Sequence, residues 1–292
     1  MNTSLNIKIR KVAVLGSGVM GSQIACHFAN IGLDVLLLDI PTPNSDDKNA
    51  LVNRDFQKAL KSSPSPIYSK DFAKRIKTGN FDDDLPKIND ADWIIEVIIE
   101  RLDLKIALFE RVEKFRKQGS LTTSNTSGIP IEMMLTGRSE DFAAHFCGTH
   151  FFNPPRYLKL LEIIPSSKTK PEVIDFFLNY GDLYLGKTTV KCKDTPAFIA
   201  NRIGVFSIMA IFKMMQNHGL NIEEVDSVTG PVSGRPKSAT FRTSDLVGLD
   251  TLVKVANGVG QNCPKDEMKE WFAIPTFLNK MLENNWLGDK TG

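Results

Sequence analysis

The sequence has no long apolar run and no excess of one charge. None of its apolar stretches reaches the roughly 18 residues that a transmembrane helix needs. Its 36 lysines and arginines nearly balance 34 aspartates and glutamates, for a formal net charge of +2, and the basic residues form no long run. Neither a membrane nor a nucleic acid is therefore expected as a partner. Residues 1–11 contain no apolar segment of signal-peptide length, so export is not expected.

Cysteine is scarce and scattered. The four cysteines, Cys26, Cys147, Cys192 and Cys263, include no C-x-x-C pair. This spacing supports neither a zinc site nor a disulfide framework, so no metal site is predicted. Few and unpatterned cysteines are typical of a reducing compartment, and we predict a cytoplasmic protein. With 292 residues, of which 42% are hydrophobic, the chain is long enough for one large or two medium domains.

A glycine-rich segment follows the first apolar run of the chain. Residues 11–15 have the pattern of a buried strand, residues 22–30 have helical spacing, and the next predicted strand ends in Asp39. This is the arrangement of a dinucleotide-binding βαβ unit, in which glycine backbone and a helix N-terminus meet the pyrophosphate. Asp39 can accept hydrogen bonds from ribose hydroxyls and would repel a 2′-phosphate, which favours NAD over NADP. The alternative is a glycine-rich turn in an unrelated α/β protein. The segment between strand and helix is Gly16, Ser17, Gly18, Val19, Met20 and Gly21.

Strand-like runs alternate with helical patterns through the first two thirds of the sequence. This alternation predicts an α/β domain, a doubly wound Rossmann-type parallel sheet, over residues 1–192. Residues 193–292 show only helical patterns and predict an all-helical second domain. Three local expectations follow: an insertion over 41–80 with a short helix near 70–77, a helix over 197–217 capped by Asp194 or Thr195, and a helix over 244–260.

A second candidate site lies in residues 150–162. The pattern predicts two strands joined by a turn that contains two prolines, and a hairpin centred on Arg156 would place His150 opposite Glu162. Directly opposed side chains lie about 5 Å apart, within reach of a hydrogen bond. A histidine held by a carboxylate is suited to proton transfer at neutral pH. The alternative is a surface histidine and a solvated glutamate without contact.

Three polar residues fall just after predicted strands or at their ends. These are Glu100, Ser127 and His150. In parallel α/β sheets, ligands bind at the carboxyl ends of the strands. Their convergence at that edge favours the catalytic interpretation of His150.

Four motifs of the sequence belong together. The motifs are residues 16–21 with Asp39, 124–127, 150–162 and 194–202, and the match that rests on them covers essentially the whole chain. Together they resemble the NAD-dependent L-3-hydroxyacyl-CoA dehydrogenases of fatty-acid β-oxidation. The resemblance implies oxidation of L-3-hydroxyacyl-CoA to 3-ketoacyl-CoA, with NAD as cofactor and the acyl-CoA lying between the two domains.

The resemblance also implies roles for individual residues. His150 would be the general base, oriented by Glu162. Ser127 would hydrogen bond the reacting oxygen on the nicotinamide side of the cofactor. Asn201 and Asn153 would position substrate and cofactor. The remaining residues implied to contact NAD are Glu100, Lys105 and Lys290, together with the glycine-rich segment.

Two segments depart from most of that family. Residues 230–242 are similar to the version in large bacterial multidomain members, which leaves the acyl chain length open. The sequence ends at Gly292, where family members continue, so we expect a part of a longer multifunctional chain or a homodimer. Two other functions stay open. One is a related dehydrogenase acting on 3-hydroxybutyryl-CoA or a sugar acid, and the other is a non-catalytic NAD-binding module.

Overall fold

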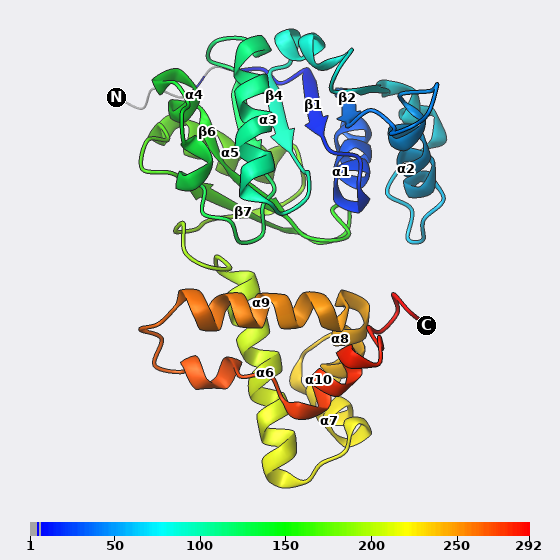
Figure 1. The fold of residues 1–292 in the computed structure, drawn as a ribbon, viewed down its shortest axis with the longest axis vertical. Coiled ribbons are helices and arrows are strands. Elements are labelled where there is room, and N and C mark those ends of the chain that lie inside the picture. Colours follow the sequence, from blue (N-terminus) through cyan, green and yellow to red (C-terminus); the bar gives the residue numbers. More distant parts are fainter. Residues whose placement is uncertain (1–4, 6) are drawn as a thin grey trace. The chain divides into compact units, whose positions relative to one another are not determined.

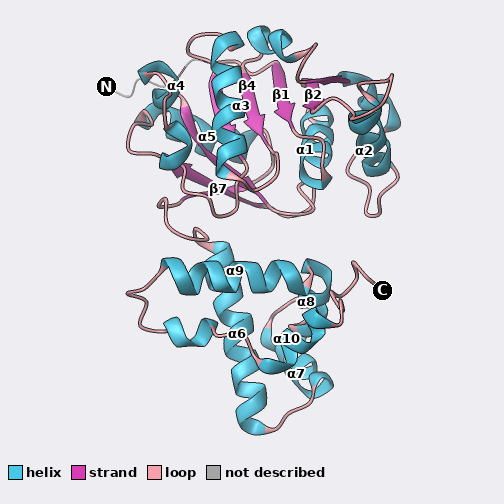
Figure 2. Ribbon diagram, viewed as in Figure 1, coloured by secondary structure: helices cyan, strands magenta, loops and turns pink. Residues whose placement is uncertain are grey.

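The computed structural model describes residues 5 and 7–292 of the chain. It divides into two compact units, Met1–Asp194 and Thr195–Gly292 (Figure 1). Each unit has a hydrophobic core of its own. The first unit is built on a sheet flanked by helices, and the second contains helices and no strand in its described residues (Figure 2). The predicted fold class is confirmed.

The sheet of the first unit has eight strands in the order β3-β2-β1-β4-β5-β6-β7-β8. All neighbours are parallel except β6 and β7, which form an antiparallel hairpin. The strand order reverses direction between β1 and β4, which is where ligands bind in such sheets. The strands are β1 (Lys11–Leu15), β2 (Asp34–Asp39), β3 (Ile76–Asn80), β4 (Trp93–Glu96), β5 (Leu121–Ser124), β6 (Phe146–Phe151), β7 (Leu160–Pro165) and β8 (Thr188–Lys191).

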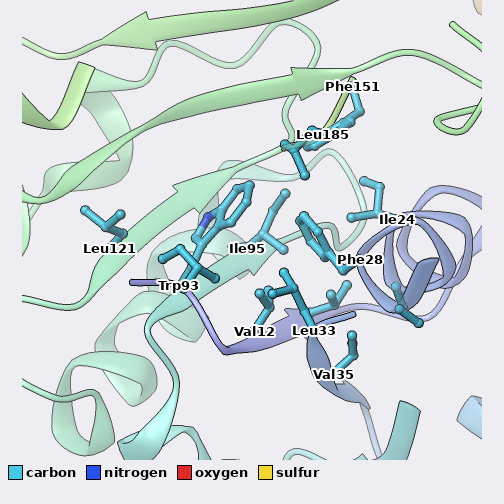
Figure 3. Close-up of a cluster of buried hydrophobic side chains, with 14 of the residues drawn as sticks. Val12, Ile24, Phe28, Leu33, Val35, Trp93, Ile95, Leu121, Phe151 and Leu185 are labelled. Carbon is cyan, nitrogen blue, oxygen red and sulfur yellow. The ribbon is translucent and has the colours of Figure 1, made fainter. Parts of the chain in front are cut away.

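The helices of the first unit cover both faces of the sheet. Side chains alternate between the faces along each strand, so Trp93 and Ile95 of β4 join one core with Phe28 of α1 (Figure 3). On the other face, Phe109 of α3 packs against Phe146 of β6 with ring centroids 5.0 Å apart. The helices are α1 (Val19–Asn30), α2 (Ala50–Leu60), α3 (Leu102–Phe115), α4 (Glu140–Ala144) and α5 (Pro171–Leu183), with 3₁₀ helices at Lys70–Arg75, Leu85–Asp90 and Glu132–Leu135.

The segment predicted as an insertion contributes a strand to the sheet. Its predicted short helix is a 3₁₀ helix over Lys70–Arg75, and β3 follows at once and pairs with β2 at the sheet edge. Residues 76–80 read Ile-Lys-Thr-Gly-Asn and lack the apolar run or strict alternation that marks a strand. Pairing with β2 gives the segment a structure that its local sequence does not indicate.

The long helix of the second unit begins three residues later than predicted. Ala197 and Phe198 have left-handed φ angles of 63° and 50°, so α6 runs over Ala200–His218. Neither Asp194 nor Thr195 caps this helix, whose N-cap position is Ile199. Asp194 has another role. Its carboxylate accepts hydrogen bonds from the backbone N–H groups of Ile131 (2.9 Å) and Glu132 (3.0 Å), within the first unit.

The helix predicted over 244–260 is two helices, separated at Gly248 with φ +93°. The second unit comprises α6, α7 (Ile222–Thr229), α8 (Phe241–Val247), α9 (Leu249–Asn262) and α10 (Thr276–Glu283), with 3₁₀ helices at Pro231–Ser233 and Lys269–Phe272. Its core gathers around Met209, Phe212 and Ala256. Among the described residues, no helix combines the length and apolar character needed to cross a membrane.

His27 of α1 is a packed residue. It is 4% exposed, and its Nε2 lies 3.1 Å from the carbonyl oxygen of Leu185. Its Nδ1 has no hydrogen-bond partner among the described residues. Burial, assisted by the nearby charge of Lys187, lowers the pKa of His27 to about 4.

We expect acid to destabilise the protein through His27. Its pKa is about 4 when folded against an ordinary 6.5, so the unfolded chain binds the proton first as pH falls. The contribution of uncharged His27 to the free energy of unfolding is complete above pH 6.5. Between pH 6.5 and 4 it is lost, by on the order of 2–3 kcal/mol. Urea unfolding at pH 7 and 4.5 measures how much unfolding free energy is lost on acidification. This loss should be smaller in His27→Leu than in the wild type, whereas replacement of the exposed His218 by leucine should leave it unchanged. Equal losses in wild type and His27→Leu would contradict this.

Candidate active site

The glycine-rich segment closes a tight turn against the end of the sheet. Gly16 has φ +112°, and its N–H donates to the carbonyl of Leu38 at 2.7 Å. A Cβ added to Gly21 would lie 1.8 Å from the carbonyl oxygen of Gly16, so only glycine fits there. A Cβ on Gly18 would meet nothing within 4 Å, which leaves its backbone open to a ligand. The turn thus has the shape that a pyrophosphate-binding loop requires.

Asp39, at the end of β2, lies beside this turn. Its Oδ2 accepts hydrogen bonds from Ser17 N (2.5 Å) and Ser17 Oγ (2.6 Å), and its Oδ1 accepts one from Ile40 N (2.7 Å). A carboxylate has about four acceptor positions, so Asp39 retains capacity for a ribose hydroxyl. A cavity of about 330 Å³ opens next to the turn and is lined by Ser17, Gly18, Val19, Gln23, Asp55, Lys58, Ala59 and Ser62. The residues present therefore fit a dinucleotide.

His150 and Glu162 form the predicted pair. They are directly opposite in the register of β6 and β7, and His150 Nδ1 lies 2.7 Å from Glu162 Oε2. The two side chains are 6% and 0% exposed. The ring of Phe152 lies 4.3 Å from that of His150, centroid to centroid. In the tautomer with the proton on Nδ1, His150 donates to Glu162 and Nε2 presents a lone pair. The pair is thus a base held by a buried carboxylate.

The connection between β6 and β7 is held from two sides. Lys187, 6% exposed, donates from Nζ to the carbonyls of Pro155 and Leu158, the latter at 2.8 Å. Burial lowers the pKa of Lys187 to about 8. Arg156 donates to the carbonyls of Ser65 (2.6 Å) and Ile67 (3.2 Å). These contacts fix the turn that follows His150.

Ser127 follows β5 and is held by Glu100. Glu100 Oε1 accepts hydrogen bonds from Thr126 Oγ1 (2.7 Å), Ser127 N (2.9 Å) and Gly128 N (3.2 Å), and lies 3.3 Å from Ser127 Oγ. Its Oε2 lies 3.3 Å from Lys105 Nζ. Burial alone would raise the pKa of Glu100, but Lys105 and these donors outweigh it and hold the pKa below its usual value.

Lys105, which contacts Glu100, also forms a buried ion pair with Glu96. Lys105 Nζ is 2.6 Å from Oε1 of Glu96, and the side chains are 1% and 0% exposed. Ile98 N donates to Oε1 of Glu96 (2.6 Å) and Ser124 Oγ donates to Oε2 (2.5 Å). Burial raises the pKa of Glu96, while Lys105 and the other donors act in the opposite direction. Sequence reasoning missed Glu96 and Ser124, although a carboxylate inside the apolar run of β4 was a visible signal.

The resemblance implies contacts with cofactor or substrate for three further residues. Asn153 is exposed in the β6–β7 connection. Asn201, in the first turn of α6, and Lys290 belong to the second unit. Lys290 Nζ donates there to Asp250 Oδ1 (2.7 Å) and Thr251 Oγ1 (2.8 Å). The contacts of these three residues with cofactor or substrate stay predictions.

Two family models cover almost all of the chain. One, described as 3-hydroxyacyl-CoA dehydrogenase, NAD binding domain, matches residues 11–195, and the other, described as 3-hydroxyacyl-CoA dehydrogenase, C-terminal domain, matches residues 198–292. The chain belongs to the 3-hydroxyacyl-CoA dehydrogenase family. Its first unit is the NAD-binding domain of that family, and its second unit is the C-terminal domain.

Relatives of this 3-hydroxyacyl-CoA dehydrogenase family member include longer proteins. A probable 3-hydroxyacyl-CoA dehydrogenase of Bacillus subtilis is 51% identical over 97% of this chain and 38% of that protein. A putative fatty acid oxidation complex trifunctional enzyme of Rickettsia felis is 37% identical over 97% of this chain and 39% of that protein. The chain thus spans about two fifths of the length of these curated relatives. The crystal structure of FadB2 from M. tuberculosis superposes with a TM-score of 0.82 at 26% identity, covering 98% of both chains.

Proposed function

We propose that this protein interconverts L-3-hydroxyacyl-CoA and 3-ketoacyl-CoA with NAD. The observation that carries the proposal is the buried His150–Glu162 pair, joined at 2.7 Å across β6 and β7 of an NAD-binding domain. A non-catalytic NAD-binding module would have no need of a buried base held by a carboxylate. Family membership supports the substrate class.

His150 acts as the general base in this proposal. Its Nε2 takes the proton of the 3-hydroxyl group. NAD, when bound, would supply the acceptor for the hydride of C3. The imidazole becomes positively charged as the hydroxyl is deprotonated, and Glu162 stabilises that charge through Nδ1. In the reverse direction the same imidazolium returns the proton to the carbonyl oxygen. The hydroxyl proton thus goes to His150, and the hydrogen of C3 leaves with both electrons of its bond as hydride.

The other residues bind and orient. The glycine-rich turn and the N-terminus of α1 receive the pyrophosphate, and Asp39 receives the ribose hydroxyls. Ser127 is exposed, and its N–H and its hydroxyl both contact the Glu100 carboxylate. In line with the family resemblance, its hydroxyl is assigned to the reacting oxygen. Asn201 and Asn153 position substrate and cofactor, and Lys290 contacts the cofactor, in line with the family resemblance.

We also propose a cytoplasmic location and an acyl-CoA substrate without nucleic-acid or membrane partners. Cys26 and Cys147 are buried thiols in the structure, which suits a reducing compartment. The longer relatives support the proposal that further catalytic domains belong to the same polypeptide, and a homodimer stays an alternative assembly.

The test is oxidation of NADH with acetoacetyl-CoA, with NADPH measured in parallel. We expect turnover with NADH and at least about tenfold less with NADPH, because Asp39 repels the 2′-phosphate. Tight NADH binding without turnover of acetoacetyl-CoA or a longer 3-ketoacyl-CoA would overturn the proposed reaction.

A further inference from the structure

Three ionisable side chains form one connected group at the carboxyl ends of β4 and β5. Lys105 Nζ lies 2.6 Å from Glu96 and 3.3 Å from Glu100. Its third neighbour is the carbonyl of Ile98, at 3.4 Å. The ammonium group of Lys105 donates hydrogen bonds to Glu96 and to the carbonyl of Ile98, and it forms an ion pair with Glu100. We call Glu96, Lys105 and Glu100 the acidic triad.

The acidic triad carries one net negative charge when both carboxylates are ionised. Lys105 is 1% exposed and Glu96 is 0% exposed, so water screens this charge poorly. Burial raises the pKa of Glu96, and the donors from Lys105, Ile98 N and Ser124 Oγ oppose that effect and favour its ionised form. Glu100, 27% exposed, brings the charge to the surface beside Ser127.

The strand order places the acidic triad beneath the path of the cofactor. Under the proposed function, a dinucleotide held by Asp39 at β2 and by the glycine-rich turn at β1 would have to extend to His150 on β6. Between β1 and β6 lie only β4 and β5, each about 4.8 Å wide. The nicotinamide end therefore falls over the ends of β4 and β5, where Glu96 and Ser124 are register partners.

We infer that Glu96 is a positioning residue. Together with Glu100 it outweighs the charge of Lys105, and the resulting net negative charge makes the site prefer oxidised NAD⁺ over NADH. The inference rests on the proposed function, which places the nicotinamide near His150. The nicotinamide ring is positively charged in NAD⁺ and neutral in NADH. A fixed negative charge stabilises only the oxidised form.

Direct binding of NAD⁺ and NADH to Glu96→Gln tests this inference. The amide is isosteric and can still accept from Lys105, so the main change is the loss of one negative charge. We expect the Kd for NAD⁺ to rise about tenfold, the order expected of one poorly screened charge across one or two strand spacings. The Kd for NADH, measured by its fluorescence, should change less than about twofold. The matched control is Glu110→Gln, which removes the same charge from an exposed position of α3 and should leave both constants unchanged.

Two results would overturn the inference. Equal weakening of NAD⁺ and NADH would show that Glu96 has only a structural role, and no weakening would show that it carries no charge. If Glu96→Gln fails to fold, Glu100→Gln removes the same charge from the acidic triad and must shift the ratio in the same direction. Turnover of acetoacetyl-CoA by the wild type tests the proposed function separately, because the affinity ratio requires no turnover.

Discussion

Replacing His150 by glutamine is expected to lower kcat for acetoacetyl-CoA reduction by about 10³-fold. Glutamine cannot exchange a proton at neutral pH, and a positioned general acid or base contributes about 10² to 10⁴ in rate. The Kd for NADH should stay within about threefold of the wild-type value, because the glycine-rich turn and Asp39 are untouched. Steady-state kinetics with saturating NADH gives kcat, and fluorescence titration gives the Kd.

The partner variant shows whether the two residues act as a unit. Glu162→Gln should lower kcat by about 10²-fold, since the amide cannot stabilise the imidazolium. The double variant should fall no further than His150→Gln alone, because Glu162 acts through the imidazole.

The matched control is His145→Gln. His145 is also buried beside an acid, with Nδ1 3.4 Å from Asp141 Oδ1, but it lies before the first residue of β6. In folded His145→Gln protein, kcat should stay within about twofold of the wild-type value. A His150→Gln enzyme that keeps a tenth of the wild-type kcat would contradict the role of His150 as base.

The hairpin that joins His150 to Glu162 was predictable because two local signals agree. The strand pattern of residues 150–162 and the prolines of its turn indicate both the pairing and the register. The βαβ unit was predictable for a similar reason, since strand, glycine turn, helix and acid occur at fixed offsets. In both cases the residues that meet are close in sequence.

Features that depend on distant residues were missed. The strand β3 exists because β2 offers it backbone partners, and residues 76–80 carry no strand pattern of their own. Asp194 looked like a helix cap from its neighbours, but it binds two N–H groups about sixty residues earlier in the chain. Glu96 accepts hydrogen bonds from Lys105 on the following helix and from Ser124 on the next strand. Local pattern cannot supply such contacts.

Gly21→Ala is expected to cost about 3–5 kcal/mol of folding free energy and to abolish NADH binding in the micromolar range. The added methyl group would lie 1.8 Å from the carbonyl oxygen of Gly16, a backbone atom. Overpacking of this kind typically costs 1–3 kcal/mol, and more where the backbone itself must move. Either the helix α1 or the turn must shift, and both shape the pyrophosphate site. Urea unfolding and NADH fluorescence titration measure the two effects.

Gly18→Ala separates the two reasons for glycine in this turn. Its added Cβ meets nothing within 4 Å and its φ of −53° suits any residue, so folding free energy should change by less than about 1 kcal/mol. The methyl group would nevertheless stand where the pyrophosphate must approach the backbone, so the Kd for NADH should rise at least about tenfold. If Gly18→Ala binds NADH normally, the cofactor does not cross this turn. If Gly21→Ala is as stable as the wild type, the close packing of α1 on the turn is not what requires glycine there.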